Sequence, residues 1–377
     1  MRIGINARYL QNTRTGIARY VYSLLANLKK VDAGNEYVLF LGGSRLVLDD
    51  IESLGFLNDV SKMPTTNQIL KIVWQHFYVP KRIKDLAIDV FHEPTFIAPY
   101  FKRCPTVVTI HDLAYKFLPD CYTLRNRLYL DLLMKKSINT SDKVIVISEN
   151  TKKDVLLNFD IKEQKVEVLP LSVDESFYPI ADRKEEQLAS VKSKYGITQD
   201  FILTVSLISP RKNLVNLIRA FAKLKKMKAS LHQLVIVGKK GWLFKKIFEE
   251  VVACGYEKDI IFCDFVSHED LVKLYNAAEV FVYPSLYEGF GLPLLEAMAC
   301  DCPVVASNIS SIPEVCADAA ILFDPHNFVE IANAIGQVLT ESSLKKSLIE
   351  KGRIRAAFFS WRKTAEGTAK VYNSLVS

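Results

Sequence analysis

The sequence contains no long apolar run, no Cys-x-x-Cys pair and no dense block of one charge, and each absence excludes a class of protein. No apolar stretch approaches the roughly 18 residues that a helix needs to span a bilayer. The seven cysteines are scattered, so we expect small buried thiols in a reducing cytoplasm rather than disulfides or a zinc site. The first residues, Met1–Asn6, read as a strand and not as an export signal.

Basic residues are in moderate excess and are spread along the chain. The net charge of +7 is compatible with anionic substrates or with an anionic lipid surface. Because the sequence has neither a Lys/Arg block nor an aromatic RNA-binding motif, we expect no nucleic-acid partner. No cluster of His, Cys, Asp and Glu has the spacing of a metal site, and we predict no bound metal.

What the sequence does contain is a repeated alternation of short Val/Ile-rich runs with helical patterns, which is typical of parallel sheets built from βαβ units. In the first half we predict strands at Arg2–Ala7, Glu36–Leu41, Val90–Phe91, Thr106–Ile110 and Lys143–Ile147. The pattern then restarts, with strands at Phe201–Ser206, Gln233–Val237, Ile260–Phe262, Val280–Tyr283, Pro303–Ala306 and Ala320–Phe323. The predicted fold class is therefore α/β, with two doubly wound domains.

A change in composition separates the two halves. At 377 residues the chain suits two domains of roughly 150–200 residues each. The segment 171–194 begins with turn residues and continues as a charged run, which indicates a hinge near 172–182. We therefore expect a first domain at 1–175 and a second at 176–360, with helices at Ile17–Leu28 and Leu188–Tyr195.

The most informative segment is 283–296, which reads YPSLYEGFGLPLLE. Proline is favoured at the first helical position, so a helix is predicted to begin near Pro293, and the preceding amides would lie at the positive end of its dipole, where a phosphate is readily held. Glu288 and Glu296 flank this anion site, and carboxylates accept hydrogen bonds from sugar hydroxyls. The alternative to ligand binding is that Glu296, in the first turn of the helix, only compensates the helix dipole.

This segment resembles the E-x7-E signature of the family 4 retaining glycosyltransferases, and the similarity extends over nearly the whole chain. It is most similar to the bacterial mannosyltransferase subgroup of surface-polysaccharide (O-antigen or capsule) biosynthesis, through Asn6–Arg8, His111–Leu113 and Pro210–Asn213. The resemblance implies the GT-B fold, in which two Rossmann-like domains face each other across a cleft. The first domain would bind the acceptor and the second the nucleotide sugar, and a last helix, at about 361–377, would cross back onto the first domain.

The family pattern also implies roles for individual residues. His111, directly after a predicted strand, matches a histidine that contacts the donor sugar, and Glu288 would hold the sugar hydroxyls; these two are the predicted catalytic residues. Arg211 and Lys212 would neutralise the charge that grows on the leaving diphosphate. Many family members carry Gly-Arg where this chain has Ser206-Leu207, so one usual arginine is absent. The predicted donor-binding residues are Gly16, Ser206, Arg211, Lys212, Phe290, Gly291, Leu292 and Glu296, the last of these at the nucleotide ribose.

Two further segments carry weaker signals. Gly16 lies in a loop, Thr13–Tyr20, where the backbone would approach the donor, although this glycine could simply make a turn. The segment Ile69–Lys84 combines aromatic residues with a basic end, which suits either acceptor contact or an anionic membrane surface. The alternative is a core helix with a solvated basic tail. The residues concerned are Trp74, Lys81, Arg82 and Lys84.

The resemblance implies a retaining hexosyltransferase that acts on a lipid-linked or growing glycan. We expect it to work in the cytoplasm at the inner face of the cell membrane, alongside other glycan-assembly enzymes. The subgroup resemblance favours GDP-mannose as donor, while UDP-glucose and UDP-N-acetylglucosamine stay open. Because the Asp-x-Asp pair that holds a metal in many other glycosyltransferases is missing, we expect metal independence. The alternative from another functional class is a non-catalytic subunit that binds sugar nucleotides in a polysaccharide-assembly complex. A nicotinamide-dependent enzyme would need a Gly-x-Gly-x-x-Gly loop that this chain lacks.

Overall fold

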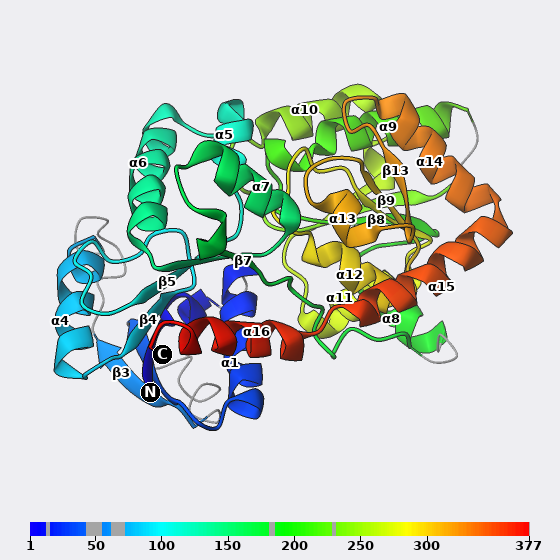
Figure 1. Cartoon of the computed structure of the whole chain (residues 1–377). Helices are drawn as coiled ribbons and strands as arrows, with labels where there is room; N and C mark the ends of the chain where they lie inside the picture. The colour runs from blue at the N-terminus through cyan, green and yellow to red at the C-terminus, as the bar shows by residue number, and fades with distance from the viewer. Residues whose placement is uncertain (13–15, 43–54, 62–71, 181–184, 228–230, 377) are drawn as a thin grey trace. The chain divides into compact units, whose positions relative to one another are not determined.

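The computed structural model describes residues 1–12, 16–42, 55–61, 72–180, 185–227 and 231–376 (Figure 1). The chain forms two compact units, the first made of Met1–Leu113, Leu124–Leu171 and Ser360–Ser377, and the second of Ala114–Thr123 and Ser172–Phe359. The main division thus falls at 171/172 rather than at 175/176. Sequence reasoning did not foresee that the segment 114–123 belongs to the second unit.

In the described part of the first unit, seven parallel strands form a sheet of order β3-β2-β1-β4-β5-β6-β7. All five residues of β5 are buried, as expected for a parallel sheet that is covered on both faces. The strands are β1 Arg2–Asn6, β2 Glu36–Gly42, β3 Leu57–Ser61, β4 Val90–Glu93, β5 Thr106–Ile110, β6 Lys143–Val146 and β7 Val166–Val168.

The helices of the first unit cover this sheet, and one of them comes from the end of the chain. The C-terminal helix α16 packs against α1, as Figure 1 shows in red and blue. Inside that contact the hydroxyl of Tyr372 lies 2.6 Å from Nδ1 of the fully buried His92. The helices are α1 Gly16–Val31, a π-helical turn Trp74–Tyr78 that leads into α4 Val79–Asp85, α6 Leu124–Thr140, α7 Glu149–Asn158 and α16 Trp361–Asn373, with short 3-10 turns at Arg8–Asn12 and Glu163–Lys165.

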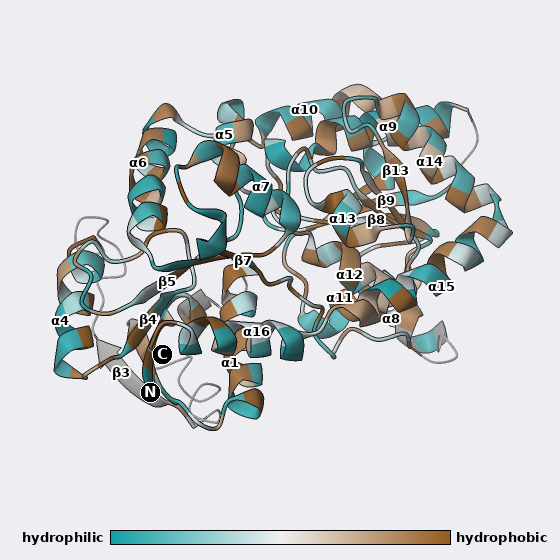
Figure 2. Ribbon diagram, viewed as in Figure 1, coloured by the Kyte–Doolittle hydropathy of each residue, from teal (hydrophilic) through white to brown (hydrophobic). Residues whose placement is uncertain are grey.

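In the second unit the described residues form a six-stranded parallel sheet of order β10-β9-β8-β11-β12-β13. Its strands are coloured brown in Figure 2, because Val, Ile, Leu and Phe dominate them. The strands are β8 Phe201–Val205, β9 Gln233–Val237, β10 Ile260–Cys263, β11 Val280–Tyr283, β12 Val304–Ser307 and β13 Ala320–Phe323.

Helices α9 and α14 supply much of the apolar core on this sheet, through residues such as Leu217, Phe221 and Ile335. The helices are α5 Ala114–Phe117, α8 Glu185–Lys194, α9 Leu214–Lys226, α10 Lys245–Cys254, α11 His268–Ala277, α12 Leu292–Ala299, α13 Ile312–Cys316, α14 Phe328–Thr340 and α15 Ser342–Phe358, with 3-10 turns at Pro119–Cys121, Pro210–Lys212 and Glu257–Asp259.

The predicted strands are all confirmed to within a few residues, whereas β3 and β7 were missed. The predicted helix start at Pro293 is confirmed as well, since α12 begins one residue earlier with this proline in its first turn. The seven cysteines are free thiols, and all but Cys104 are buried. Within the described residues no helix combines the length and the apolar character that crossing a membrane requires.

Candidate active site

The topology of the second unit marks the place where a ligand site is expected. Its strand order runs outward in both directions from the neighbouring strands β8 and β11, so the connections after these two strands lead to opposite sides. In doubly wound sheets, ligands bind beyond the carboxyl ends of the strands at this switch point. The segment that begins at Ser206 follows β8, and Pro284–Gly291 follows β11, so the two main sequence motifs meet here.

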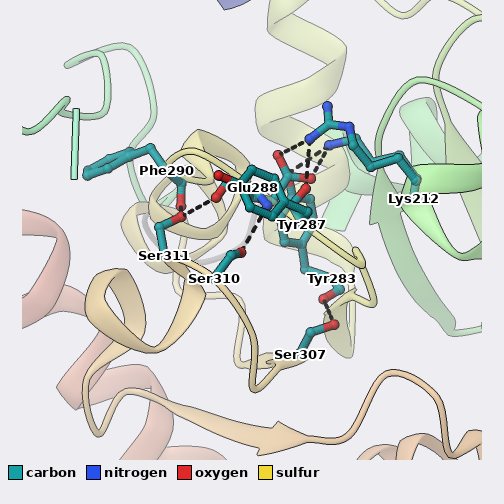
Figure 3. Close-up of polar contacts among 9 residues, drawn as sticks. Lys212, Tyr283, Tyr287, Glu288, Phe290, Ser307, Ser310 and Ser311 are labelled. Carbon is teal, nitrogen blue, oxygen red and sulfur yellow. Dashed lines mark hydrogen bonds and ion pairs between the residues drawn. The ribbon is translucent and has the colours of Figure 1, made fainter. Parts of the chain in front are cut away.

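At this point Glu288 forms a compact ion cluster with two cations (Figure 3). The Nη1 atom of Arg211 donates to one carboxylate oxygen at 3.0 Å, and Nζ of Lys212 donates to the other at 2.5 Å. Lys212 also donates to the hydroxyl of Tyr283 at 3.0 Å, and Arg211 donates to the carbonyl of Tyr287 at 2.7 Å. Sequence reasoning assigned the cations to the diphosphate and Glu288 to the sugar, and it missed their direct pairing.

The ion cluster fixes the charge state of Glu288. Burial alone raises the pKa of this carboxyl group, but the nearby Arg211 and Lys212 outweigh burial and lower the pKa to about 2. Glu288 is therefore ionised at neutral pH. A carboxylate has about four lone-pair positions and the two cations occupy two of them, so the group retains capacity to accept hydrogen bonds from a ligand.

Two serines on the segment after β12 hold the loop that carries Glu288. Ser310 accepts from the backbone N–H of Glu288 at 2.9 Å, while the hydroxyl of Ser311 lies 2.9 Å from the carbonyl oxygen of Glu288 and 3.1 Å from that of Phe290 (Figure 3). Sequence reasoning did not single out these two serines, although they follow the predicted strand Pro303–Ala306 closely. They orient the loop and with it the carboxylate.

The loop passes into α12 through a glycine that the backbone requires. Gly291 has φ of +109° and is the residue before α12, so it supplies no side-chain cap for the first turn. A side chain here would be strained, because L-residues rarely adopt this conformation. The first amides of α12, which starts at Leu292, remain at the positive end of the helix dipole.

The side chain of Phe290 is buried in the core of the second unit. Its ring is 3% exposed and packs edge-to-face on Phe359 at 5.4 Å. The ring therefore belongs to the core, and the predicted donor contact of Phe290 concerns its backbone amide and stays a prediction.

Glu296 lies within α12 and is buried. One carboxylate oxygen accepts a hydrogen bond from the hydroxyl of Tyr275, on α11, at 2.9 Å. The structure therefore places the second glutamate of the motif in the same unit as the ion cluster, with a tyrosine that orients it.

Ser206 lies immediately after β8, and the backbone of Gly238 packs tightly against it. The backbone of Gly238 passes so near that a Cβ there would come within 1.9 Å of the carbonyl oxygen of Ser206. The hydroxyl of Ser206 is buried without a hydrogen-bond partner among the described residues. A polar group of this kind is available for a ligand, which fits the donor-binding prediction without testing it.

Asn213 is a structural residue that sequence reasoning missed. Its backbone adopts the left-handed conformation (φ of +55°), and its side-chain amide donates to the carbonyls of Pro284 and Pro325 at 3.1 and 2.7 Å. It therefore ties the segment that carries Arg211 and Lys212 to the segment before Glu288.

His111 belongs to the first unit, directly after β5. Its Nε2 lies 2.8 Å from the carbonyl of Pro94, so Nε2 carries the proton and Nδ1 is the acceptor of the ring. Tyr20 and Phe96 pack edge-on against it at 4.9 and 5.7 Å. Burial lowers the pKa of His111, although the Pro94 bond and Asp112 oppose this change. The imidazole is therefore neutral at pH 7.

The remaining predicted residues also lie in the first unit. Gly16 is exposed at the start of α1, and a Cβ there would meet nothing within 4 Å, while residues 13–15 of its loop lie outside the described part. Lys81 and Lys84 are exposed on α4, and Arg82 is partly exposed. Residues 69–71 of that segment are likewise not described.

Trp74 requires a correction. It is 5% exposed and packs in a core cluster with Val38, Phe40 and Phe91. The alternative of a core helix with a basic tail is therefore right for this residue, because the π-helical turn buries the indole ring. Trp74 is not a surface contact for a membrane.

Among the described residues, no group of three or more His, Cys, Asp or Glu side chains is arranged to hold a metal ion. The charged groups at the carboxyl edge of the second sheet are instead the ion cluster of Arg211, Lys212 and Glu288.

Comparison with known families gives two matches that together cover most of the chain. Residues 14–177 match the family described as Glycosyltransferase Family 4, and residues 188–355 match the family described as Glycosyl transferases group 1. Both motifs of the ion cluster fall within the second match, and His111 falls within the first.

Relatives with known names agree with these families. The chain is 29% identical over 374 residues to an O-antigen chain mannosyltransferase B of Escherichia coli, covering 96% of each chain. It is 30% identical over 326 residues to an uncharacterized glycosyltransferase of Methanocaldococcus jannaschii, covering 80% of each. Among solved structures, the HepE protein of Anabaena in complex with UDP-glucose has a TM-score of 0.76 at 18% identity, with all of both chains covered, and supports the fold alone.

Proposed function

Since this chain belongs to the family 4 glycosyltransferases and has their GT-B fold, we propose that it transfers mannose from GDP-mannose to a hydroxyl of a lipid-linked glycan in O-antigen assembly. The observation that carries the proposal is the ion cluster of Arg211, Lys212 and Glu288 at the switch point of the second unit. It combines positive charge for a diphosphate with a carboxylate for sugar hydroxyls, beside the N-terminus of α12.

In the proposed reaction the bond between the anomeric carbon and the diphosphate oxygen breaks, and a bond from the same carbon to the acceptor oxygen forms on the same face. The acceptor proton passes to the leaving phosphate, so no protein nucleophile is required. Arg211 and Lys212 stabilise the charge on the departing diphosphate. Glu288 accepts hydrogen bonds from sugar hydroxyls while the two cations keep it ionised.

The neutral state of His111 suits a related role in the first unit. With its proton on Nε2 and bonded to Pro94, the ring presents Nδ1 as an acceptor. We propose that Nδ1 accepts a hydrogen bond from a hydroxyl of the donor sugar. A neutral ring avoids placing a second positive charge beside a reacting carbon that itself becomes positive.

Mannose is proposed from the names of relatives, such as the Escherichia coli O-antigen chain mannosyltransferase. UDP-glucose stays the second donor to examine, since a protein of the same fold binds it. We also propose that the reaction proceeds without a metal ion and that the protein works in the cytoplasm, attached to the inner membrane surface beside other glycan-assembly enzymes.

A binding panel tests the donor. The shift in melting temperature is measured with GDP-mannose, UDP-glucose and UDP-N-acetylglucosamine, and slow hydrolysis of each donor is followed. GDP-mannose alone should stabilise the wild type, and Glu288→Gln should lose hydrolysis while remaining folded. Stabilisation by a UDP sugar but not by GDP-mannose would replace the proposed donor. A protein that binds a donor but never transfers its sugar would be the non-catalytic subunit.

A further inference from the structure

One helix of the first unit turns an apolar stripe toward solvent. On α6, Leu124, Leu128 and Leu132 are 66%, 63% and 67% exposed. Residues four apart lie one above another on a helix, so the three leucines form a single stripe. The opposite side of α6 is packed through Met134, Ser137 and Ile138. Soluble domains seldom expose a continuous row of large apolar side chains, and such a row indicates an interaction surface.

Basic residues border this stripe. Helix α6 carries Arg125, Arg127, Lys135 and Lys136 against a single acid, Asp131, which gives it a net charge of +3 (4 − 1). Figure 2 shows the corresponding mixture of brown and teal on α6. A leucine stripe with basic borders is the pattern of a helix that lies in the interface of an anionic bilayer.

A group of exposed aromatic rings continues the surface. Phe77 and Phe101 are 59% and 46% exposed, and their rings contact each other at a centroid distance of 5.1 Å. Tyr100, 41% exposed, packs against Phe101, and the ammonium group of Lys136 lies over its ring, which joins α6 to the aromatic group. We name the combined set the docking surface: Leu124, Leu128, Leu132, Phe77, Tyr100 and Phe101.

The docking surface also connects with the basic segment identified from the sequence. Phe77 lies in the π-helical turn that runs directly into α4, whose Lys81 and Lys84 are exposed. The contact between Phe77 and Phe101 therefore links the turn that leads into α4 with Tyr100, whose ring Lys136 of α6 covers. Aromatic rings at the headgroup level, with Lys and Arg reaching the phosphates, are the anchors of interfacial proteins.

We infer that the docking surface inserts into an anionic phospholipid bilayer, with α6 lying in the plane of the interface. The inference rests on the proposed function, because a lipid-linked acceptor would be presented at such a surface. Charge favours this occupant over a second copy of the chain, since two helices of net charge +3 would repel each other across a shared stripe. Lipid phosphates supply the missing negative charge.

Vesicle sedimentation tests the inference. The wild type should bind vesicles of phosphatidylglycerol and phosphatidylethanolamine and should not bind pure phosphatidylcholine vesicles. Leu128→Ser should weaken binding on the order of tenfold, as expected when one leucine no longer enters the apolar layer. Leu157→Ser is the matched control, since Leu157 is 72% exposed on α7 of the same unit, and it should bind as the wild type does. Equal binding by all three proteins, or none by the wild type, would overturn the inference.

Two more measurements separate the possible outcomes. If Leu128→Ser instead dissociates a dimer seen by sedimentation velocity without lipid, the surface is a self-association interface and the inference is wrong. Donor hydrolysis in solution is measured for the same variants and should be unchanged. A wild type that hydrolyses the donor but binds no vesicles rejects only the membrane surface, whereas absent hydrolysis in a wild type that binds vesicles rejects only the proposed function.

Discussion

At the scale of single residues, the site is organised by one buried acid and its two cations. Removing a carboxylate and two cations from water is costly, and their mutual attraction repays this only with good geometry. Here both carboxylate oxygens are engaged, and Tyr283 and the Tyr287 carbonyl satisfy further N–H groups. The arrangement is therefore sensitive to the loss of any one member.

Lys212→Met should expose this sensitivity. The substitution leaves Glu288 in a buried position with a single cation, so we expect a loss of about 3 kcal/mol in the free energy of unfolding and much weaker donor binding. Urea unfolding followed by tryptophan fluorescence measures the loss. Lys273→Met is the control, because its partner Glu269 is 80% exposed, and it should change stability by less than about 1 kcal/mol. Equal effects of the two substitutions would contradict the importance of the ion cluster.

Gly291→Ala addresses the backbone of the same loop. A side chain at φ of +109° is strained, so we expect a cost of about 1–3 kcal/mol and a higher KM for the donor. Gly16→Ala should not destabilise the protein, since its surroundings leave room for a methyl group. Thermal unfolding of both variants gives the comparison. If Gly291→Ala were as stable as the wild type and had the wild-type KM, the claim that the backbone before α12 requires glycine would be wrong.

At the scale of elements, the C-terminal helix is joined to the first sheet by a line of buried hydrogen bonds. Tyr372 on α16 contacts Nδ1 of His92, Nε2 of His92 lies 2.8 Å from the hydroxyl of Thr109, and that hydroxyl lies 3.1 Å from the hydroxyl of Tyr20. Tyr20 in turn packs on His111. The line therefore connects α16 and α1 with the strand that precedes His111.

This line predicts a pH dependence. Burial and the nearby His111 lower the pKa of His92 to about 3, whereas an unfolded histidine titrates near 6.5. The unfolded chain takes up the proton first as the pH falls, so His92 contributes stability above about pH 6.5 that is lost progressively down to about pH 3. The stability difference between wild type and His92→Gln should shrink by about 2 kcal/mol from pH 7 to pH 5. Urea titrations at both pH values measure it, and a constant difference would show that His92 is not held neutral.

The elements themselves were largely predictable, and the reasons differ from one to another. Val/Ile runs such as Gln233–Val237 are buried on both faces, so composition alone identifies them. The strand β7 has only three residues and a partly exposed glutamate, too short for any periodic pattern. Residue types and spacing identified Glu288, Arg211 and Lys212, but no local signal shows that residues 76 or 77 positions apart form ion pairs.

At the scale of the whole molecule, the chemistry is proposed to need no metal ion, because the ion cluster and the start of α12 supply the positive charge. We expect the transfer rate in excess EDTA to stay within about twofold of the untreated rate, since the cations of the protein do not dissociate. A radiolabelled-donor assay with and without chelator provides the measurement. Loss of activity that Mg²⁺ or Mn²⁺ alone restores would contradict this prediction.

The division of the chain into units has a consequence for anyone who wishes to express half of the protein. The backbone changes unit after residues 113, 123, 171 and 359, so neither half is one uninterrupted stretch of the gene. A fragment 172–359 would lack Phe117, whose ring stacks on Tyr287 at 5.3 Å beside Glu288, and Cys121, whose carbonyl accepts from the Trp242 indole. A fragment 1–171 would lack Tyr372 and leave His92 without its partner. Isolated halves should therefore be unstable, whereas a fusion that restores 114–123 to the second half offers a route to a separately folded donor-binding module.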